Sequence, residues 1–133
     1  MRSTAHNDTN NNVYNMSLLS IDKHVKSMPL LKGTDATEFR DYAFVLKAVL
    51  NMADNRLPSW MDTATTLDTP VEQPADDQPA AEASRTLYFV LCMTCKDHSQ
   101  VIIQQVENGH GFEAWRRLSR ALDPMTGARG SPC

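Results

Sequence analysis

The spacing of the large apolar residues is the feature that most constrains how this chain can fold. Within residues 30–62 they recur every three or four positions, as Phe39, Ala43, Leu46, Val49, Leu50 and Ala53. That period places them on one face of an α-helix, whereas a half-buried strand needs strict alternation. Asp35 before this run, with Glu38 three positions later, forms a variant of the capping box. We therefore predict an amphipathic helix that ends near Asn55, with Pro58 preventing its simple continuation.

A second helical block is predicted over residues 81–123, and one segment within it has a different pattern. Residues 87–93 are apolar on every side, so we expect a central helix that neighbours contact all round. A buried β-strand is the competing interpretation, because Tyr88, Phe89 and Val90 favour strands. The alanine-rich approach to this segment favours the helix.

Two further helices are expected after this segment. Asp97 is placed to cap a short helix with Gln100 at the capping-box position, and that helix carries Val101, Ile102 and Val106. Residues 108–111, Asn-Gly-His-Gly, interrupt it. The last helix has one apolar stripe, formed by Phe112, Trp115, Leu118 and Leu122, and Asp123-Pro124 ends it.

These segments have only one another to bury their apolar faces against. The predicted fold is therefore all-α, a small bundle of four to five helices. We expect a polar leader at 1–29, one domain at 30–124 with a proline-containing acidic loop at 63–80, and a flexible tail at 125–133.

The leader is asparagine-rich and lacks the apolar core of a secretory signal, so we expect it to be disordered and the chain to be cytoplasmic. No apolar run approaches the roughly 20 residues of a membrane-spanning helix, so no membrane contact is expected.

The distribution of charge argues against general nucleic-acid binding. Net charge is −3, and residues 57–84 carry six acidic and no basic residues. The basic cluster lies near the C-terminal end, at Arg116, Arg117, Arg120 and Arg129. Its arginines are candidates for weak contact with RNA phosphates. The favoured alternative is a solvated helix face on which Glu113 pairs with Arg117 at i,i+4.

Candidate chemistry is confined to Cys92-Met93-Thr94-Cys95, with His98 three residues later. This CxxC pair is compatible with half a zinc site or a redox pair, but the spacing supplies no fourth ligand. Buried cysteines that pack as small apolar groups are the favoured interpretation. The four histidines are scattered, and the chain has neither a phosphate-binding glycine loop nor paired carboxylates on a predicted helix. We predict no catalytic residue, no metal, no cofactor and no small-molecule substrate.

The order of several motifs resembles the capsid part of copia-type retrotransposon Gag polyproteins. The matching segments are Leu31-Lys32-Gly33-Thr34 followed by Phe39, then Leu46–Leu50, Leu57-Pro58-Ser59-Trp60 and Gly111–Leu118 with its Trp-x-x-Leu motif. The resemblance covers residues 30–124. Phe39 stands where that family usually has tryptophan. Family members also continue with further capsid helices and often a zinc knuckle, so the resemblance implies that this chain is a Gag fragment.

The resemblance implies a structural rather than enzymatic role: self-association into particles around the element's RNA. The predicted core or signature positions, from the apolar spacing and the family motifs together, are Phe39, Leu46, Leu50, Trp60, Leu87, Leu91, Ile102, Phe112, Trp115 and Leu118. A helical adaptor that binds a partner peptide in a groove between the two blocks is the main alternative. A thiol or zinc protein that uses Cys92 and Cys95 is the third.

Overall fold

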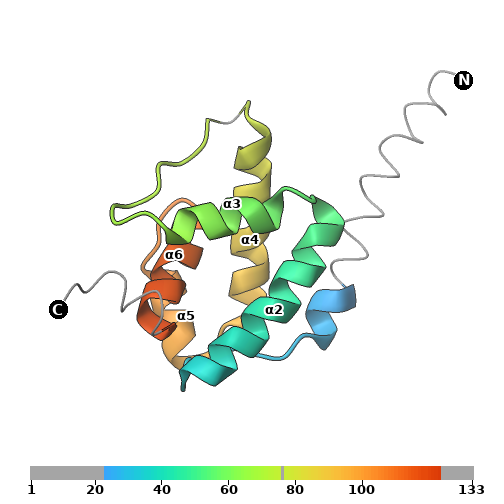
Figure 1. Cartoon of the computed structure of the whole chain (residues 1–133), viewed down its shortest axis with the longest axis vertical. Helices are drawn as coiled ribbons and strands as arrows, with labels where there is room; N and C mark the ends of the chain where they lie inside the picture. Colours follow the sequence, from blue (N-terminus) through green and yellow to red (C-terminus); the bar gives the residue numbers. More distant parts are fainter. Residues whose placement is uncertain (1–22, 76, 124–133) are drawn as a thin grey trace, which may run out of the picture.

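The computed structural model describes residues 23–75 and 77–123, and these form an all-helical domain. Its helices are α2 (Ala36–Ala53), α3 (Leu57–Thr65), α4 (Pro79–Thr94), α5 (Asp97–Gln104) and α6 (Gly111–Leu122), arranged as in Figure 1. Extended pairing in the described ranges is limited to one isolated bridge between Leu31 and Cys95. The predicted all-α class is confirmed, and the alternative of a strand at 87–93 is wrong.

The start of α2 follows the predicted cap. Asp35 accepts a hydrogen bond from the backbone N–H of Glu38 at 2.8 Å. The Glu38 carboxylate accepts from the backbone N–H groups of Lys32, Gly33 and Thr34 at 2.8–2.9 Å. Burial opposes ionisation of Glu38, but these hydrogen bonds outweigh it and lower its pKa. Gly33 allows the turn because its φ is +90°, a conformation that favours glycine.

Several predicted helix boundaries need correction. The first helix ends at Ala53, before Asn55, and a separate helix α3 begins at Leu57 with Pro58 in its first turn. The loop expected from residue 63 begins only after Thr65, where α3 ends.

The cap of α5 also differs from the prediction. Lys96, with the extended backbone that an N-cap needs, occupies the cap position, and Asp97 is already the first helical residue. The side chain that reaches back is Ser99 rather than Gln100: its Oγ accepts from the Lys96 N–H at 3.1 Å.

The predicted leader is too long. Residues 23–27 form a helical turn, and Val25 and Met28 are buried in the core. Leu31 then pairs with the end of α4: its N–H donates to the Thr94 carbonyl, and its carbonyl accepts from the Lys96 N–H, both at 2.8 Å. The domain therefore includes residues 23–29, which were predicted to belong to the leader. Residues 1–22 and the predicted tail at 125–133 lie outside the described residues.

The centre of the bundle is α6, which packs against α3, α4 and α5, while α2 packs against α3. Helix α4 was expected to be surrounded, and that expectation is wrong. It buries Leu87, Val90 and Leu91, but Phe89 is 52% and Met93 47% exposed. No helix of the described residues combines the length and apolar character needed to cross a membrane.

Candidate functional site

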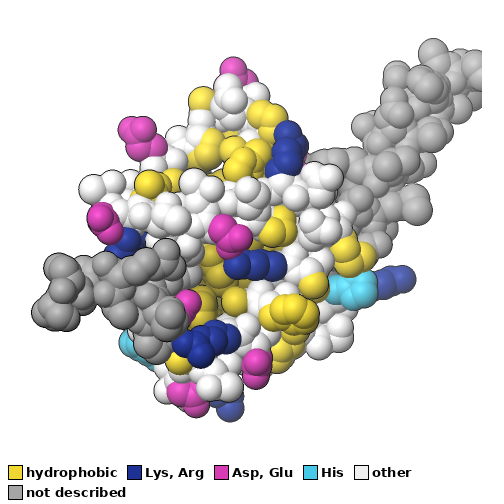
Figure 2. All heavy atoms as spheres, viewed as in Figure 1, with side chains coloured by type: hydrophobic (Ala, Val, Ile, Leu, Met, Phe, Trp, Pro, Cys, Tyr) yellow, Lys and Arg dark blue, Asp and Glu magenta, His cyan; other side chains and the backbone are white. Residues whose placement is uncertain are grey.

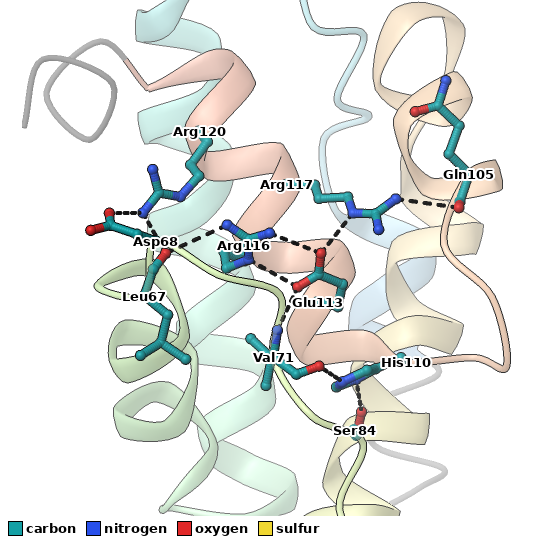
Figure 3. Close-up of polar contacts among 10 residues, drawn as sticks. All are labelled: Leu67, Asp68, Val71, Ser84, Gln105, His110, Glu113, Arg116, Arg117 and Arg120. Atoms are coloured by element: carbon teal, nitrogen blue, oxygen red, sulfur yellow. Dashed lines mark hydrogen bonds and ion pairs between the residues drawn. The ribbon is translucent and has the colours of Figure 1, made fainter. Parts of the chain in front are cut away.

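Helix α6 is enclosed on both its apolar and its polar side. Its apolar stripe of Phe112, Trp115, Leu118 and Leu122 is buried as the sequence pattern indicates. Glu113 and Arg116 lie outside that stripe and are buried as well. The polar side is covered by the loop between α3 and α4, which crosses it (Figure 3).

Glu113 is the hub of the polar side (Figure 3). Arg116 donates to both carboxylate oxygens, from Nε at 2.9 Å and from Nη2 at 3.0 Å. Arg117 Nε donates to Oε2 at 2.7 Å, and the backbone N–H of Val71 donates to Oε1 at 2.9 Å. Burial opposes ionisation of this side chain, which is 4% exposed, but these four donors outweigh it and lower the Glu113 pKa to about 2.

The same side of α6 holds the acidic loop in place. Arg120 donates to the carbonyl of Leu67 and to the Asp68 carboxylate, the latter at 2.9 Å. Further along the loop, His110 Nε2 lies 2.7 Å from the Val71 carbonyl, an acceptor, so this nitrogen carries the proton. The loop is thus attached to α6 at both Leu67–Asp68 and Val71. Sequence reasoning missed this attachment, although opposite charge on the loop and on α6 was a usable signal.

The arginines predicted to contact RNA all direct guanidinium groups at acceptors within the domain. Besides its bonds to Glu113, Arg116 lies 3.5 Å from the Leu67 carbonyl, and Arg117 donates to the Gln105 carbonyl at 3.3 Å. The predicted i,i+4 pair of Glu113 and Arg117 is present. The expectation of a solvated helix face is wrong for Arg116, which is 8% exposed. Arg129 lies outside the described residues.

The N-terminus of α6 approaches α4 very closely. The Gly111 N–H donates to Ser84 Oγ at 2.9 Å, and His110 Nδ1 lies 3.4 Å from the same oxygen. A Cβ at position 111 would overlap the Ser84 carbonyl oxygen and lie 2.8 Å from the Tyr88 nitrogen. Glycine is required here because backbone occupies the space that a side chain would fill.

This buried network is suited to holding structure rather than to chemistry. Each Glu113 oxygen already accepts two hydrogen bonds, and the carboxylate is held ionised, so it neither supplies nor takes up a proton near neutral pH. Both ring nitrogens of His110 face acceptor or hydroxyl partners. Among the described residues, no cluster of three or more His, Cys, Asp or Glu side chains is placed to hold a metal ion.

The two cysteines of the CxxC pair lie in different environments. Cys95 is 1% exposed, and burial raises its pKa to about 11. Cys92 is exposed on α4, so the expectation that both are buried is wrong for this residue. Partial burial still raises the pKa of Cys92, so neither thiol is activated as a thiolate.

The predicted core and signature residues come together, with one exception. Phe39, Leu46, Leu50, Leu87, Leu91, Ile102, Phe112, Trp115 and Leu118 are buried in one cluster. Trp60 is only half-buried and packs against that cluster. It meets Phe112 edge-on with ring centroids 6.2 Å apart, and the Arg56 guanidinium lies 4.9 Å from the centroid of the Trp60 ring.

A groove of about 570 Å³ runs between α2 on one side and α3 and α6 on the other. Its base is aromatic, because Phe39 of α2 stacks on Trp115 of α6 with ring centroids 5.3 Å apart. The other lining residues are Arg40, Ala43, Phe44, Lys47, Asp62, Thr65, Thr66, Ser119 and Asp123. On the face that Figure 2 shows, apolar side chains are exposed beside basic and acidic ones. The groove is thus lined by helices of both predicted blocks, α2 and α3 from the first and α6 from the second.

Two ion pairs connect the walls of this groove. Arg40 lies 4.0 Å from Asp123, and Lys47 lies 2.5 Å from Asp62. Phe44 is 78% exposed beside them, the most exposed large apolar side chain among the described residues. The indole N–H of Trp115 is buried and has no acceptor within the part of the chain that the structure describes.

Comparison of this chain with known proteins and protein families identifies no relative. No protein-family model matches this sequence, and neither the curated proteins nor the solved structures show a significant match to it.

Proposed function

We propose that this chain is a non-enzymatic structural domain of the Gag capsid type, which acts by self-association. The observation that carries this proposal is the set of large apolar side chains that the core does not use. Phe89 and Met93, at i and i+4 on α4, are 52% and 47% exposed, and Cys92 lies exposed on the same face. Single exposed apolar residues are ordinary, whereas a grouped face favours contact with another protein.

The Gag part of the proposal is supported by the order of motifs in the sequence, from the Leu-Lys-Gly-Thr turn to the Trp-x-x-Leu helix. The packing of α6 agrees with a structural role, because the charged groups of the Glu113 network hold the loop between α3 and α4 in place. In this proposal Arg116 does not bind RNA, because contact with a phosphate would break its buried ion pair with Glu113. Any packaging of RNA would use other basic groups of the particle.

Sedimentation velocity over a concentration series tests the proposal directly. We expect the weight-average mass to rise with concentration beyond that of a dimer. Phe89→Ser combined with Met93→Ser should stop growth beyond the dimer while the melting temperature stays within a few degrees. A strict monomer up to about 1 mM, where a contact of roughly 4 kcal/mol would still be visible, would contradict it.

The helical adaptor remains a second candidate, because the groove between the two blocks is open and has an aromatic base. An amphipathic peptide helix that inserts apolar side chains at i, i+3 and i+4 is the ligand such a groove accepts. A peptide-library selection against the monomer distinguishes the two functions. Micromolar capture of one helical motif, lost on Phe39→Ala and paired with no self-association, would favour the adaptor.

A further inference from the structure

The charges along the groove are sorted by wall. Both cations, Arg40 and Lys47, belong to α2 and are seven positions apart, which is about two helical turns or 10 Å. Both anions lie on the opposite wall: Asp62 on α3 and Asp123 directly after α6. Each end of the groove therefore has its positive side at α2 and its negative side across from it.

This arrangement is self-complementary under a two-fold rotation. A two-fold axis laid along the groove turns a second copy over and places its α2 wall above the α3–α6 wall of the first. Arg40 of each copy then faces Asp123 of the other, and Lys47 faces Asp62, because each cation and its anion share one end of the groove. Two-fold dimers require such a self-complementary patch.

The apolar groups fit the same rotation. Phe44 projects beside the groove, while Phe39, Ala43 and Trp115 line it, so each copy offers both a projecting ring and an apolar recess. The internal ion pairs lie partly in solvent, since the side chains of Arg40 and Asp123 are 54% and 23% exposed and those of Lys47 and Asp62 are 35% and 64% exposed. Ion pairs at such positions stabilise a fold only weakly, so they can exchange partners at modest cost.

We infer that the α2/α3/α6 groove is the interface at which two copies of this chain pair, with Phe44 of each copy entering the groove of the other. The inference rests on the proposed self-association and specifies its first step. Contacts through Phe89 and Met93 then extend the pairs into larger assemblies.

Charge reversal on one wall at a time tests the interface. The double variant Asp62→Lys/Asp123→Lys makes both walls positive, and Arg40→Glu/Lys47→Glu makes both walls negative. Each variant alone is expected to be monomeric at concentrations where the wild type is dimeric, because like charges then face each other. An equimolar mixture should form a heterodimer with a dissociation constant within about threefold of the wild-type value, since every contact is again between opposite charges.

A pair of aromatic substitutions supplies the matched control. Phe44→Ser should raise the dimer dissociation constant at least about 30-fold, the effect of losing a central aromatic anchor. Phe89→Ser removes another exposed phenylalanine, one that is 52% exposed on α4, and should leave the dimer step within about threefold of wild type. Circular dichroism melts verify that each variant is folded. If a charge-reversed variant does not fold, the Phe44→Ser and Phe89→Ser comparison decides the matter.

The possible outcomes separate this inference from the proposed function. A wild-type chain that never associates would overturn both. A wild type that associates while Phe44→Ser and the charge-reversed variants associate equally well would overturn the groove interface alone. The groove interface would also be overturned if a foreign helical peptide filled the groove and left self-association unchanged.

Discussion

Charged groups lie on two sides of helix α6, and the two sets have different roles. On one side, Glu113, Arg116 and Arg117 form a network around a carboxylate that is 4% exposed. On the other side, next to the groove, Asp123 and Asp62 pair with Arg40 and Lys47 near the surface. Both sets pair carboxylates with cationic side chains, at 2.9 and 2.7 Å on the buried side and at 4.0 and 2.5 Å on the groove side. Because of this difference in burial, the first set fixes the loop, whereas the more exposed second set can exchange partners at modest cost.

The difference follows from what each group would lose. A buried carboxylate deprived of its donors has no water to replace them, so removing one partner is costly. The two charges of an exposed pair are solvated when they separate, and salt weakens their attraction with a Debye length of about 8–10 Å. The buried side is therefore suited to stability, and the groove side to recognition. Substitutions on the two sides should accordingly differ in their effect on stability.

The largest effect is expected from Gly111→Ala on the buried side. The new Cβ would overlap the Ser84 carbonyl oxygen, so α6 would have to move away from α4. We expect a loss of about 4 kcal/mol or more in the free energy of unfolding, or no folding, measured by urea denaturation.

Gly109→Ala is its control. Position 109 has a positive φ of +63°, but a Cβ there meets only the Tyr88 ring at 3.7 Å. Backbone strain alone should cost about 1–2 kcal/mol. Equal losses for the two substitutions would contradict the close α4–α6 approach.

Glu113→Gln should have the next largest effect. The amide removes the negative charge that compensates buried Arg116 and places an N–H₂ group among donors. We expect a loss of about 3–5 kcal/mol in unfolding free energy. Glu82→Gln, on the exposed first turn of α4, is the control and should cost less than about 1 kcal/mol. A Glu113→Gln protein as stable as this control would show that the network is dispensable.

The pH dependence of stability reports on the same carboxylate. The folded-state pKa of Glu113 is about 2, below its ordinary value of 4.5, so its ionised form favours the folded state. Its contribution is complete above pH 4.5 and is lost as the pH falls towards 2; it amounts to about 3 kcal/mol. Unfolding free energies measured from pH 6 to pH 2 should fall more steeply for the wild type than for Glu113→Gln. Identical slopes would rule out this role.

The smallest effect is expected on the groove side. In a double-mutant cycle, Lys47→Ala and Asp62→Ala should show a coupling of at most about 0.5 kcal/mol in the monomer, because the Asp62 side chain is 64% exposed. Raising the salt concentration should reduce even that value. A coupling as large as that of Glu113 with Arg116 would erase the contrast between the two sides.

Local pattern determined the helices. The three- and four-residue period of α2 and α6 and the Asp35 cap predict elements that the structure contains. Such features depend on residues close together in the sequence, so the sequence reveals them directly. Boundaries were less well predicted, as the separate α3 and the Lys96 cap show.

Which helix would be central was decided only by tertiary structure. The uniformly apolar segment of α4 keeps Phe89 and Met93 exposed, while the polar residues Glu113 and Arg116 of α6 are buried. Glu113 and Arg116 are buried because the acidic loop crosses α6, whereas about half of the surface of Phe89 and Met93 stays exposed. The groove likewise exists because α2 meets α6 through Phe39 and Trp115 rather than through close backbones. Contacts between residues far apart in the chain depend on how several helices pack at once, and the pattern of any one helix does not contain that information.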